Sequence, residues 1–293
     1  MLFRWPELYV ALTLLAAVLF AAGNALQKQA VASRLPPLPA AAWLERGRQV
    51  FAALFRSPIW MLGLALTIAA FAVEIQALAM GDVTVVKPLS RIQILFVLAI
   101  GVGALGERLA RAEWLGVGMI VAGSVLLGSE PGGSRVWVPR TAVIAAVAVG
   151  VGAIVAAGLW FTDRGPGRRR EHAPALAAGA FFGLGDILMK AATDAARART
   201  GGFNLATGDT LTSLAVAPEL VLSLVATAFA FAVQQMAFSR GRVSLVVPLI
   251  GVAGTAVVVV LGATLLQEQI SALRAASIAM MLAGTLLIGR AAP

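Results

Sequence analysis

The segment FAVEIQALAMGDVTVVKPL, from Phe71 to Leu89, returns 160 residues later as FAVQQMAFSRGRVSLVVPL, from Phe231 to Leu249. The match continues upstream, where the six residues that begin at Gly23 align with the six that begin at Gly185, at an offset of 162. Apolar helices that occur twice in one chain are typical of membrane transporters whose site lies between the two repeats.

The composition is that of a membrane protein. Hydrophobic residues make up 60% of the 293 residues and charged residues only 13%, whereas soluble domains carry about 25% charged residues. The apolar residues fall in blocks of roughly 17–25, which is the length that crosses a bilayer as a helix. We therefore expect an all-α polytopic membrane protein with about nine spans, at 8–32, 59–80, 83–105, 112–128, 138–161, 174–195, 215–238, 243–265 and 272–289.

Several function classes are excluded or disfavoured by the residue types present. Cysteine is absent, which excludes disulfides, thiol chemistry and cysteine metal sites. The net charge of +9 comes mostly from arginines in loops beside apolar blocks, so we expect it to set topology and not to bind nucleic acid. The first block ends like a cleaved secretory signal, but it carries Asn24 and Lys28 and matches an interior block. We therefore interpret it as the first membrane helix.

The repeats divide the chain into three parts. Repeat one spans 1–129 and includes a segment at 34–57 that fits a short helix lying in the membrane interface. The connector, 130–173, holds an apolar block without a repeat mate and a basic loop, and repeat two spans 174–293. Because four spans and the connector separate the copies, repeat two is expected upside down in the membrane, which makes the repeats inverted.

The arginines predict the orientation. Thirteen of them fall in loops on one side of the predicted bundle and six on the other. Basic loops stay in the cytoplasm, so we expect an inner-membrane (plasma-membrane) protein with its N-terminus outside and its C-terminus in the cytoplasm.

Three short motifs in repeat one carry a resemblance to a known family. They are Val86-Lys87-Pro88-Leu89 in the third span, Leu105-Gly106-Glu107-Arg108-Leu109 at its end, and Glu113-Trp114-Leu115-Gly116 before the fourth. They resemble the drug/metabolite transporter (DMT) superfamily, in particular its nine-helix branch of EamA-like and NIPA-type permeases. The resemblance implies a secondary transporter without a cofactor and leaves the substrate open. Lys87 departs from the pattern, because an uncharged residue is commoner before this proline.

Six ionisable residues fall inside the predicted spans, where charge is costly and usually faces a cavity or a partner. Lys28 and Lys190 lie near helix ends, from which a long side chain can snorkel to the headgroups. Asp186 precedes Lys190 by four residues, which is the favourable order for a local ion pair. The remaining three are Glu74, Lys87 and Arg91.

Glu74, Lys87 and Arg91 are candidates for substrate contact. The turn at Gly81 makes their helices adjacent, and Glu74 and Lys87 are expected at a similar depth, roughly 8–9 Å. The matching residues of repeat two are all uncharged, namely Gln234, Val247 and Gly251. Glu74 neutralises one base, which leaves Arg91 as a buried cation that a substrate carboxylate or phosphate could satisfy. A structural ion cluster is the alternative.

Two prolines and several polar side chains complete the candidate site. Pro88 and Pro248 fall at matching positions inside helices, where proline frees a backbone carbonyl, and paired breaks point to a transport site. Glutamates 107 and 268, which align at an offset of 161, precede predicted helices and are explained by capping. The polar side chains that can line a cavity or bond between helices are Asn24, Gln76, Gln93, Gln234 and Gln235.

These residues predict a secondary transporter that works by alternating access on a small or amphipathic solute with an anionic group. Lys87 and Arg91 would receive the anion, and Glu74 would be their counter-ion or carry a coupling proton. A transporter of a divalent cation or cationic drug, with Glu74 and Asp186 as ligands, and a non-transporting scaffold are the alternatives. We expect no enzyme activity, cofactor or metal site. Expected partners are a small-molecule or lipid-like substrate, membrane lipids and a proton or ion; a homodimer is left open.

Overall fold

The computed structural model describes residues 5–34, 50–96, 111–129, 169–240 and 243–291, with scattered positions between 99 and 153. Within those residues the regular secondary structure is helical, as the sequence predicts, and there is no strand. The helices are α1 (Trp5–Arg34), α3 (Pro58–Met80), α4 (Val83–Ser90), α6 (Arg111–Gly128), α8 (Arg169–Thr200), α9 (Gly208–Ala215), α10 (Pro218–Arg240), α11 (Val243–Thr264) and α12 (Ala272–Ala291).

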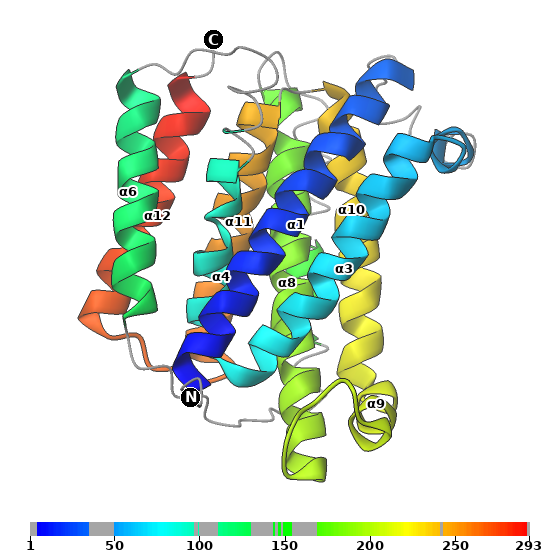
Figure 1. Cartoon of the computed structure of the whole chain (residues 1–293), viewed down its shortest axis with the longest axis vertical. Helices are drawn as coiled ribbons and strands as arrows, with labels where there is room; N and C mark the ends of the chain where they lie inside the picture. The colour runs from blue at the N-terminus through cyan, green and yellow to red at the C-terminus, as the bar shows by residue number, and fades with distance from the viewer. Residues whose placement is uncertain are drawn as a thin grey trace.

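The helices form a bundle in which corresponding elements pack in corresponding pairs (Figure 1). Helix α1 packs on α3, and α8 packs on α10. Helix α1 rises from the end of the bundle where the chain begins, whereas α8 runs down toward that end, so the two are antiparallel. The remaining large contacts join α11 to α8 and α6 to α12, and α4 lies between α1 and α11.

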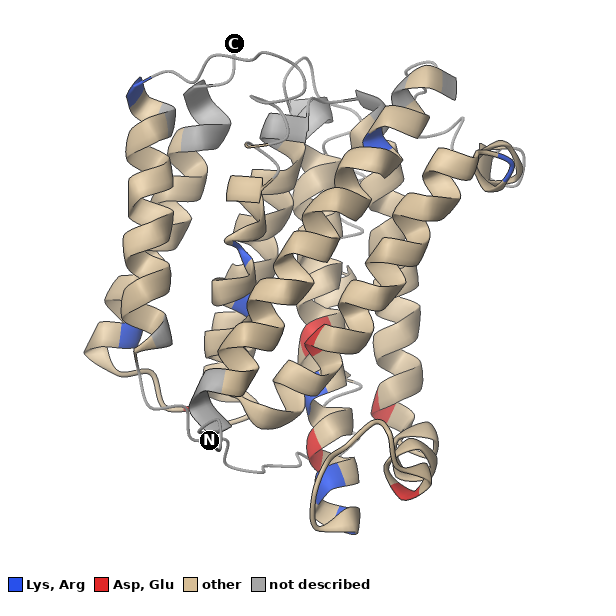
Figure 2. Cartoon of the chain, in the orientation of Figure 1, with Lys and Arg blue, Asp and Glu red and all other residues tan. Residues whose placement is uncertain are grey.

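Among the residues that the structure describes, five helices are long and apolar enough to cross a membrane. They contain the segments Leu8–Val31, Pro58–Met80, Ala173–Thr200, Pro218–Phe238 and Val246–Thr264. Two shorter apolar segments, Trp114–Leu127 and Ala272–Leu287, lie in α6 and α12. Among the described residues, most Lys, Arg, Asp and Glu lie toward the two ends of the bundle, and a few lie inside it on α3, α4 and α8 (Figure 2). This charge distribution suits a protein embedded in a membrane.

Two of the predicted spans are not seen as long helices. The span predicted at 138–161 lies mostly outside the described residues, as does most of the segment at 34–57. The span predicted at 83–105 is interrupted, since α4 ends at Ser90 and a turn occupies 91–92 before helix resumes at 93–96. In this turn the amide of Arg91 donates to the carbonyl of Pro88 over 3.0 Å, a tighter spacing than in an α-helix.

The two prolines therefore differ in their effect. Pro88 lies inside α4, two residues before the helix ends, and the break places Arg91 just after it. Helix α11 continues through Pro248 to Thr264, so the matching break that we expected in repeat two is absent from the described structure. Pro248 has no backbone N–H, so α11 lacks one helical hydrogen bond at this point. Helix α11 packs along α8, and this contact holds the helix together there.

The contact between α8 and α11 depends on glycine. A Cβ at Gly183 would lie 2.5 Å from the carbonyl oxygen of Gly254, and a Cβ at Gly254 would lie 3.0 Å from the carbonyl oxygen of Gly179. Gly179 and Gly183 are one helical turn apart, the small-residue spacing that lets membrane helices approach closely. This close approach fixes the wall of α11 that faces the end of α4.

Candidate functional site

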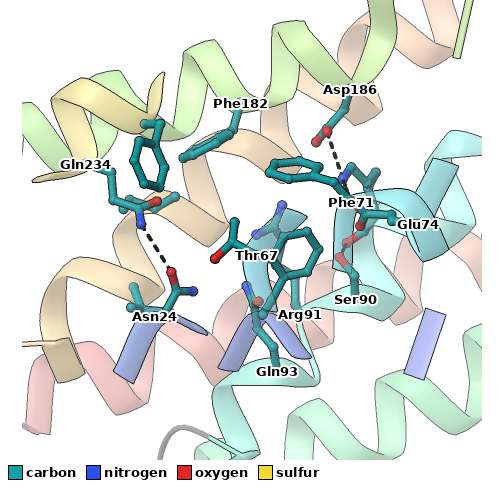
Figure 3. A pocket seen from close by; sticks show the side chains of 15 residues that line it. Asn24, Thr67, Phe71, Glu74, Ser90, Arg91, Gln93, Phe182, Asp186 and Gln234 are labelled. Carbon is teal, nitrogen blue, oxygen red and sulfur yellow. Dashed lines mark hydrogen bonds and ion pairs between the residues drawn. The ribbon is translucent and has the colours of Figure 1, made fainter. Parts of the chain in front are cut away.

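A cavity of about 70 Å³ lies where the two halves of the bundle meet (Figure 3). Six helices and the turn after α4 form its walls, and the lining mixes polar with apolar side chains. The helices are α1, α3, α4, α8, α10 and α11. The lining residues are Phe20, Asn24, Thr67, Phe71, Glu74, Lys87, Ser90, Arg91, Gln93, Phe182, Asp186, Phe231, Gln234, Val247 and Ile250. The predicted site residues Asn24, Glu74, Lys87, Arg91, Gln93, Asp186 and Gln234 are thus brought together on one cavity.

The lining is built largely from pairs of positions that correspond in the two copies of the duplicated sequence. Phe20 and Phe182 are 162 residues apart, as are Asn24 and Asp186. Four further pairs at a spacing of 160 also line the cavity: Phe71 with Phe231, Glu74 with Gln234, Lys87 with Val247, and Ser90 with Ile250. Both copies of the duplicated sequence therefore face one cavity.

Lys87 is held between two carboxylates. Its Nζ lies 2.6 Å from Oε2 of Glu74 and 2.7 Å from Oδ1 of Asp186, and all three side chains are at least nine-tenths buried. The contact predicted between Glu74 and Lys87 is confirmed. Among the described residues, the second oxygen of Asp186, Oδ2, is buried without a hydrogen-bond partner. One ammonium group therefore joins α3, α4 and α8.

The local ion pair expected between Asp186 and Lys190 is wrong. Lys190 pairs instead with Asp194, over 2.9 Å, and donates to the carbonyl oxygen of Leu78 over 3.0 Å. Lys190 is only 1% exposed, so it does not snorkel. Sequence spacing alone allows either carboxylate of α8 as its partner. Lys190 pairs with Asp194 because the carboxylate of Asp186 is already paired with the ammonium group of Lys87 from α4.

Arg91 reaches from the break after α4 across to α11. Its Nε donates to Oγ1 of Thr255 over 3.0 Å, and it is 8% exposed. A Cβ at Gly251 would lie 3.3 Å from Cδ of Arg91, and one at Gly254 would lie 3.4 Å from Nη2. The guanidinium group therefore lies against a glycine face of α11 that has space for it. Gly251 is the position that corresponds to Arg91 in the second copy, so the two copies touch at this point.

The charge count at the cavity corrects the argument from sequence. That argument left Arg91 as the excess cation beside a single Glu74–Lys87 pair. The structure adds Asp186 to the cluster, so two carboxylates face two bases and the formal charges sum to zero. What distinguishes Arg91 is its bonding, because its hydrogen bond to Thr255 goes to a neutral hydroxyl.

The rest of the lining combines a polar pair with an aromatic wall. Nε2 of Gln234 donates to Oδ1 of Asn24 over 3.1 Å, which joins α10 to α1. The rings of Phe20 and Phe71 meet edge to face with centroids 4.9 Å apart. Phe182 from α8 and Phe231 from α10 also line the cavity. Such a wall can receive an apolar or aromatic portion of a solute.

Four predicted site residues do not line the cavity. Lys28 is half-buried and donates to the carbonyl oxygen of Phe238 over 2.6 Å, so it ties α1 to the end of α10 and does not simply snorkel. Gln76 contacts the backbone of Phe203 and Leu205. Gln235 belongs to a buried network with Gln27, Trp60 and Thr67, and Lys190 forms the pair described above.

Several cavity residues were not predicted from the sequence. Thr67, Ser90 and the four phenylalanines lack a charge or amide. Thr255, which does not line the cavity but binds Arg91, carries a hydroxyl that is unremarkable in an apolar helix. The duplication itself could have identified the phenylalanines, since Phe20 matches Phe182 and Phe71 matches Phe231. Phenylalanine at matching depth in both copies is a signal that a search for charged residues misses.

A second set of polar contacts closes the bundle at the end where α3 turns into α4. Glu268 accepts hydrogen bonds from the backbone amides of Val83 and Thr84, over 2.9 and 3.0 Å. The capping role predicted for Glu268 is thus present, but on another helix, whereas Glu107 lies outside the described residues. Nη1 of Arg274 contacts Oδ2 of Asp82 over 3.1 Å. Burial and then nearby Glu268 raise the pKa of Asp82 above its usual range, while Arg274 acts in the opposite direction.

Comparison with known proteins gives one partial relative. No family model matches the chain, and no solved structure matches it. A stretch of 52 residues is 46% identical to a Sinorhizobium protein described as "Uncharacterized transporter in cobO 3'region". The stretch covers 18% of this chain and 37% of that protein. Together, the apolar helices and this partial similarity indicate a membrane-embedded, transporter-like protein.

Proposed function

We propose that this protein is a secondary transporter that works by alternating access around the cavity between its two halves. Its two copies, 1–129 and 174–293, would be inverted repeats related by an axis in the membrane plane. The connector at 130–173 would carry the chain between them. Such an arrangement matches the drug/metabolite transporter pattern that the sequence resembles. Transporters of this kind hold their substrate at the repeat interface and expose it by rocking one repeat against the other.

Three observations support the repeat relation. Helices α1 and α8 run in opposite directions, as an inverted pair must (Figure 1). Corresponding helices pack in corresponding pairs, α1 on α3 and α8 on α10. Finally, Arg91 lies against Gly251, its counterpart in the second copy. Two equivalent positions can touch only near the axis that relates them, so the proposed axis passes close to Arg91.

We further propose that the substrate carries an anionic group and that Arg91 binds it. The observation that carries this proposal is the different bonding of the charged groups around the cavity. Each carboxylate, Glu74 and Asp186, has an ammonium within 2.7 Å, whereas Arg91 is bonded to a neutral hydroxyl. A guanidinium can bind a carboxylate or phosphate with two parallel hydrogen bonds. Arg91 therefore presents hydrogen-bond donors to a solute in the cavity, whereas both carboxylates are already paired with Lys87.

A cation is the second candidate substrate, favoured by the four phenylalanines of the wall. An organic cation is attracted to aromatic faces, and Glu74 and Asp186 would then be its ligands. This mode requires the cation to displace Lys87 from both carboxylates, which costs two close ion pairs. An anion that binds Arg91 does not have to displace Lys87 from either carboxylate, so we prefer the anion mode.

The size of the cavity limits what the present state can hold. A volume of about 70 Å³ accommodates a few water molecules. An aromatic carboxylate would fill or exceed it, so larger solutes require the halves to move apart.

A ligand-induced thermal shift on the purified protein tests the proposal. A ligand that binds the folded state raises the apparent melting temperature. Benzoate and inorganic phosphate serve as anionic probes and tetraethylammonium as the cationic probe. We expect an anion to stabilise the wild type, Arg91→Gln to abolish the shift, and Arg91→Lys to recover part of it, because a point charge lacks the planar fork.

A matched control uses the exposed arginine at the start of α6. Arg111→Gln removes the same charge away from the cavity, so the anion-induced shift should equal that of the wild type. A shift with tetraethylammonium alone, or an undiminished anion shift in Arg91→Gln, would show that Arg91 is not the anchor and would favour the cation mode.

A further inference from the structure

We infer that Asp186 is a proton-binding site and that the transporter carries one proton with each anion. This inference rests on the proposed function, because it concerns what must accompany an anion into the same cavity. It assigns the two carboxylates that hold Lys87 to different roles. Glu74 is the permanent counter-ion of Lys87, and Asp186 is the group that takes up and releases the proton.

The first step of the argument is the charge balance of the empty site. Lys87 and Arg91 contribute two positive charges, and Glu74 and Asp186 contribute two negative charges, so the sum is zero. All four residues are less than 9% exposed. An anion that binds Arg91 brings the site to one net negative charge. Net charge in a buried site is costly, so binding is favoured when a proton restores neutrality.

The second step identifies the group that takes the proton. Oδ2 of Asp186 is buried and has no hydrogen-bond partner among the described residues. A proton on Oδ2 converts this oxygen from an unpaired acceptor into a donor. Oδ1 remains available to Lys87, 2.7 Å away.

Glu74 is the less suitable acceptor of the proton. Its oxygens are not among the buried atoms without a hydrogen-bond partner in the described residues, and at 2.6 Å from Lys87 it would stay as the charged partner after Asp186 is neutralised. Lys87 therefore never lacks a counter-ion during the cycle. If both carboxylates were neutralised, Lys87 would become a buried cation without a charged partner, which is strongly unfavourable.

The groups that face Asp186 come from every neighbouring part of the site. Glu74 faces it from α3, and Lys87 and Arg91 face it from α4 and the turn after it. Helices α1, α10 and α11 contribute uncharged groups to the cavity, Asn24, Gln234 and Val247 among them. On α8 itself, Lys190 is one turn further along and is engaged by Asp194.

The proposed step is balanced in charge and atoms. On the side from which substrate enters, one proton bonds to Oδ2 of Asp186 and one anion binds Arg91. Both leave on the opposite side, where the O–H bond breaks and Asp186 returns to the carboxylate form beside Lys87. The loaded and empty sites then carry the same net charge, so neither form of the transporter crosses its closed state with an uncompensated charge.

The experiment measures proton uptake when benzoate is added to the purified wild-type protein in weakly buffered detergent solution. The pH is varied between about 6 and 8, where benzoate is ionised. We expect about one proton taken up per benzoate bound. Because the two ligands are linked reciprocally, the affinity for benzoate should fall about tenfold per pH unit at the upper end of the range.

Two variants identify the proton acceptor. Asp186→Asn, which imitates the protonated side chain, should bind benzoate with no proton uptake and with pH-independent affinity. Glu74→Asp keeps a negative charge beside Lys87 and should retain proton uptake wherever it binds benzoate. If Asp186→Asn does not fold, the wild-type stoichiometry and the Glu74→Asp variant still show whether a proton accompanies the anion when the charge of the site is preserved.

Three results would overturn the inference, and they separate it from the proposed function. Benzoate binding to the wild type without proton uptake would leave an anion transporter whose Asp186 takes no proton. Proton uptake that persists in Asp186→Asn would assign the proton to a group other than Asp186. Binding of tetraethylammonium with no binding of benzoate or phosphate would reject the anion transporter and the inference together.

Discussion

Removal of Lys87 should destabilise the protein more than removal of either carboxylate that it binds. Lys87→Met leaves Glu74 and Asp186 as two neighbouring buried carboxylates without their shared ammonium. Breaking one buried ion pair typically costs about 3–5 kcal/mol. Because two carboxylates lose their partner here, we expect a loss at or above the upper end of that range.

The single acid variants should cost less, because Lys87 keeps one carboxylate in each. Glu74→Gln leaves Asp186 at 2.7 Å, and Asp186→Asn leaves Glu74 at 2.6 Å. Each should lose about 1–3 kcal/mol, the range for an altered buried polar contact. Adding Asp186→Asn to Lys87→Met should restore part of the stability, with a coupling energy of about 0.5–3 kcal/mol.

The assay is unfolding of the purified protein in mixed detergent micelles, with the free energy of unfolding compared across the four variants. The order of destabilisation is the informative result. If Lys87→Met is no more destabilising than Glu74→Gln, or if Lys87→Met and Asp186→Asn act additively, Lys87 does not bridge the two carboxylates and the description of the site is wrong.

Three further predictions follow from other parts of the structure. Gly183→Ala places a Cβ 2.5 Å from the carbonyl oxygen of Gly254 and should lower the free energy of unfolding by about 1–3 kcal/mol. The control Gly118→Ala, where nothing lies within 4 Å, should be neutral or stabilising by up to about 1 kcal/mol; equal effects would show that α8 and α11 are not in close contact. Glu268→Gln leaves one acceptor oxygen for the amides of Val83 and Thr84 and should cost about 1–3 kcal/mol in the same assay, and an unchanged value would mean that this cap is not formed. A fluorescent protein fused to the C-terminus should fluoresce in the cytoplasm and a tag before Arg4 should be reachable from outside, whereas a cytoplasmic N-terminus would contradict the inverted repeats.

The broad architecture could be predicted because it depends on properties that are local in sequence. Apolar blocks of membrane-spanning length predict helices wherever they occur. The contact between Glu74 and Lys87 could also be predicted, because the short turn at Gly81 leaves the two helices adjacent. The helix break after Pro88 could be predicted from the proline itself. The same reasoning was wrong for Pro248, because α11, which packs on α8, continues as a helix through it.

The partners of Asp186 and Arg91 could not be predicted, because they come from distant parts of the chain. Asp186 has a lysine four residues later in sequence, and only the packing of α8 beside α4 shows that Lys87 takes it instead. Arg91 contacts Thr255 and Gly251 on α11, more than 150 residues away. A charge count made within repeat one therefore left Arg91 without a balancing negative charge. Asp186, which belongs to repeat two, supplies that charge.

Access to the cavity from both sides of the membrane is the most direct test of transport. The chain has no cysteine, so a single introduced thiol can be labelled without background. Ser90 lines the cavity and is 4% exposed, whereas Ser223 is 1% exposed and donates to the carbonyl oxygen of Gly185, away from the cavity. Each is replaced by cysteine and exposed to a membrane-impermeant thiol reagent in right-side-out and inside-out vesicles.

Alternating access predicts that Ser90→Cys reacts from each face of the membrane, that benzoate slows both reactions, and that Ser223→Cys reacts from neither face. Labelling of Ser90→Cys from one face only, or from neither, with no effect of benzoate, would contradict a transport site at this cavity.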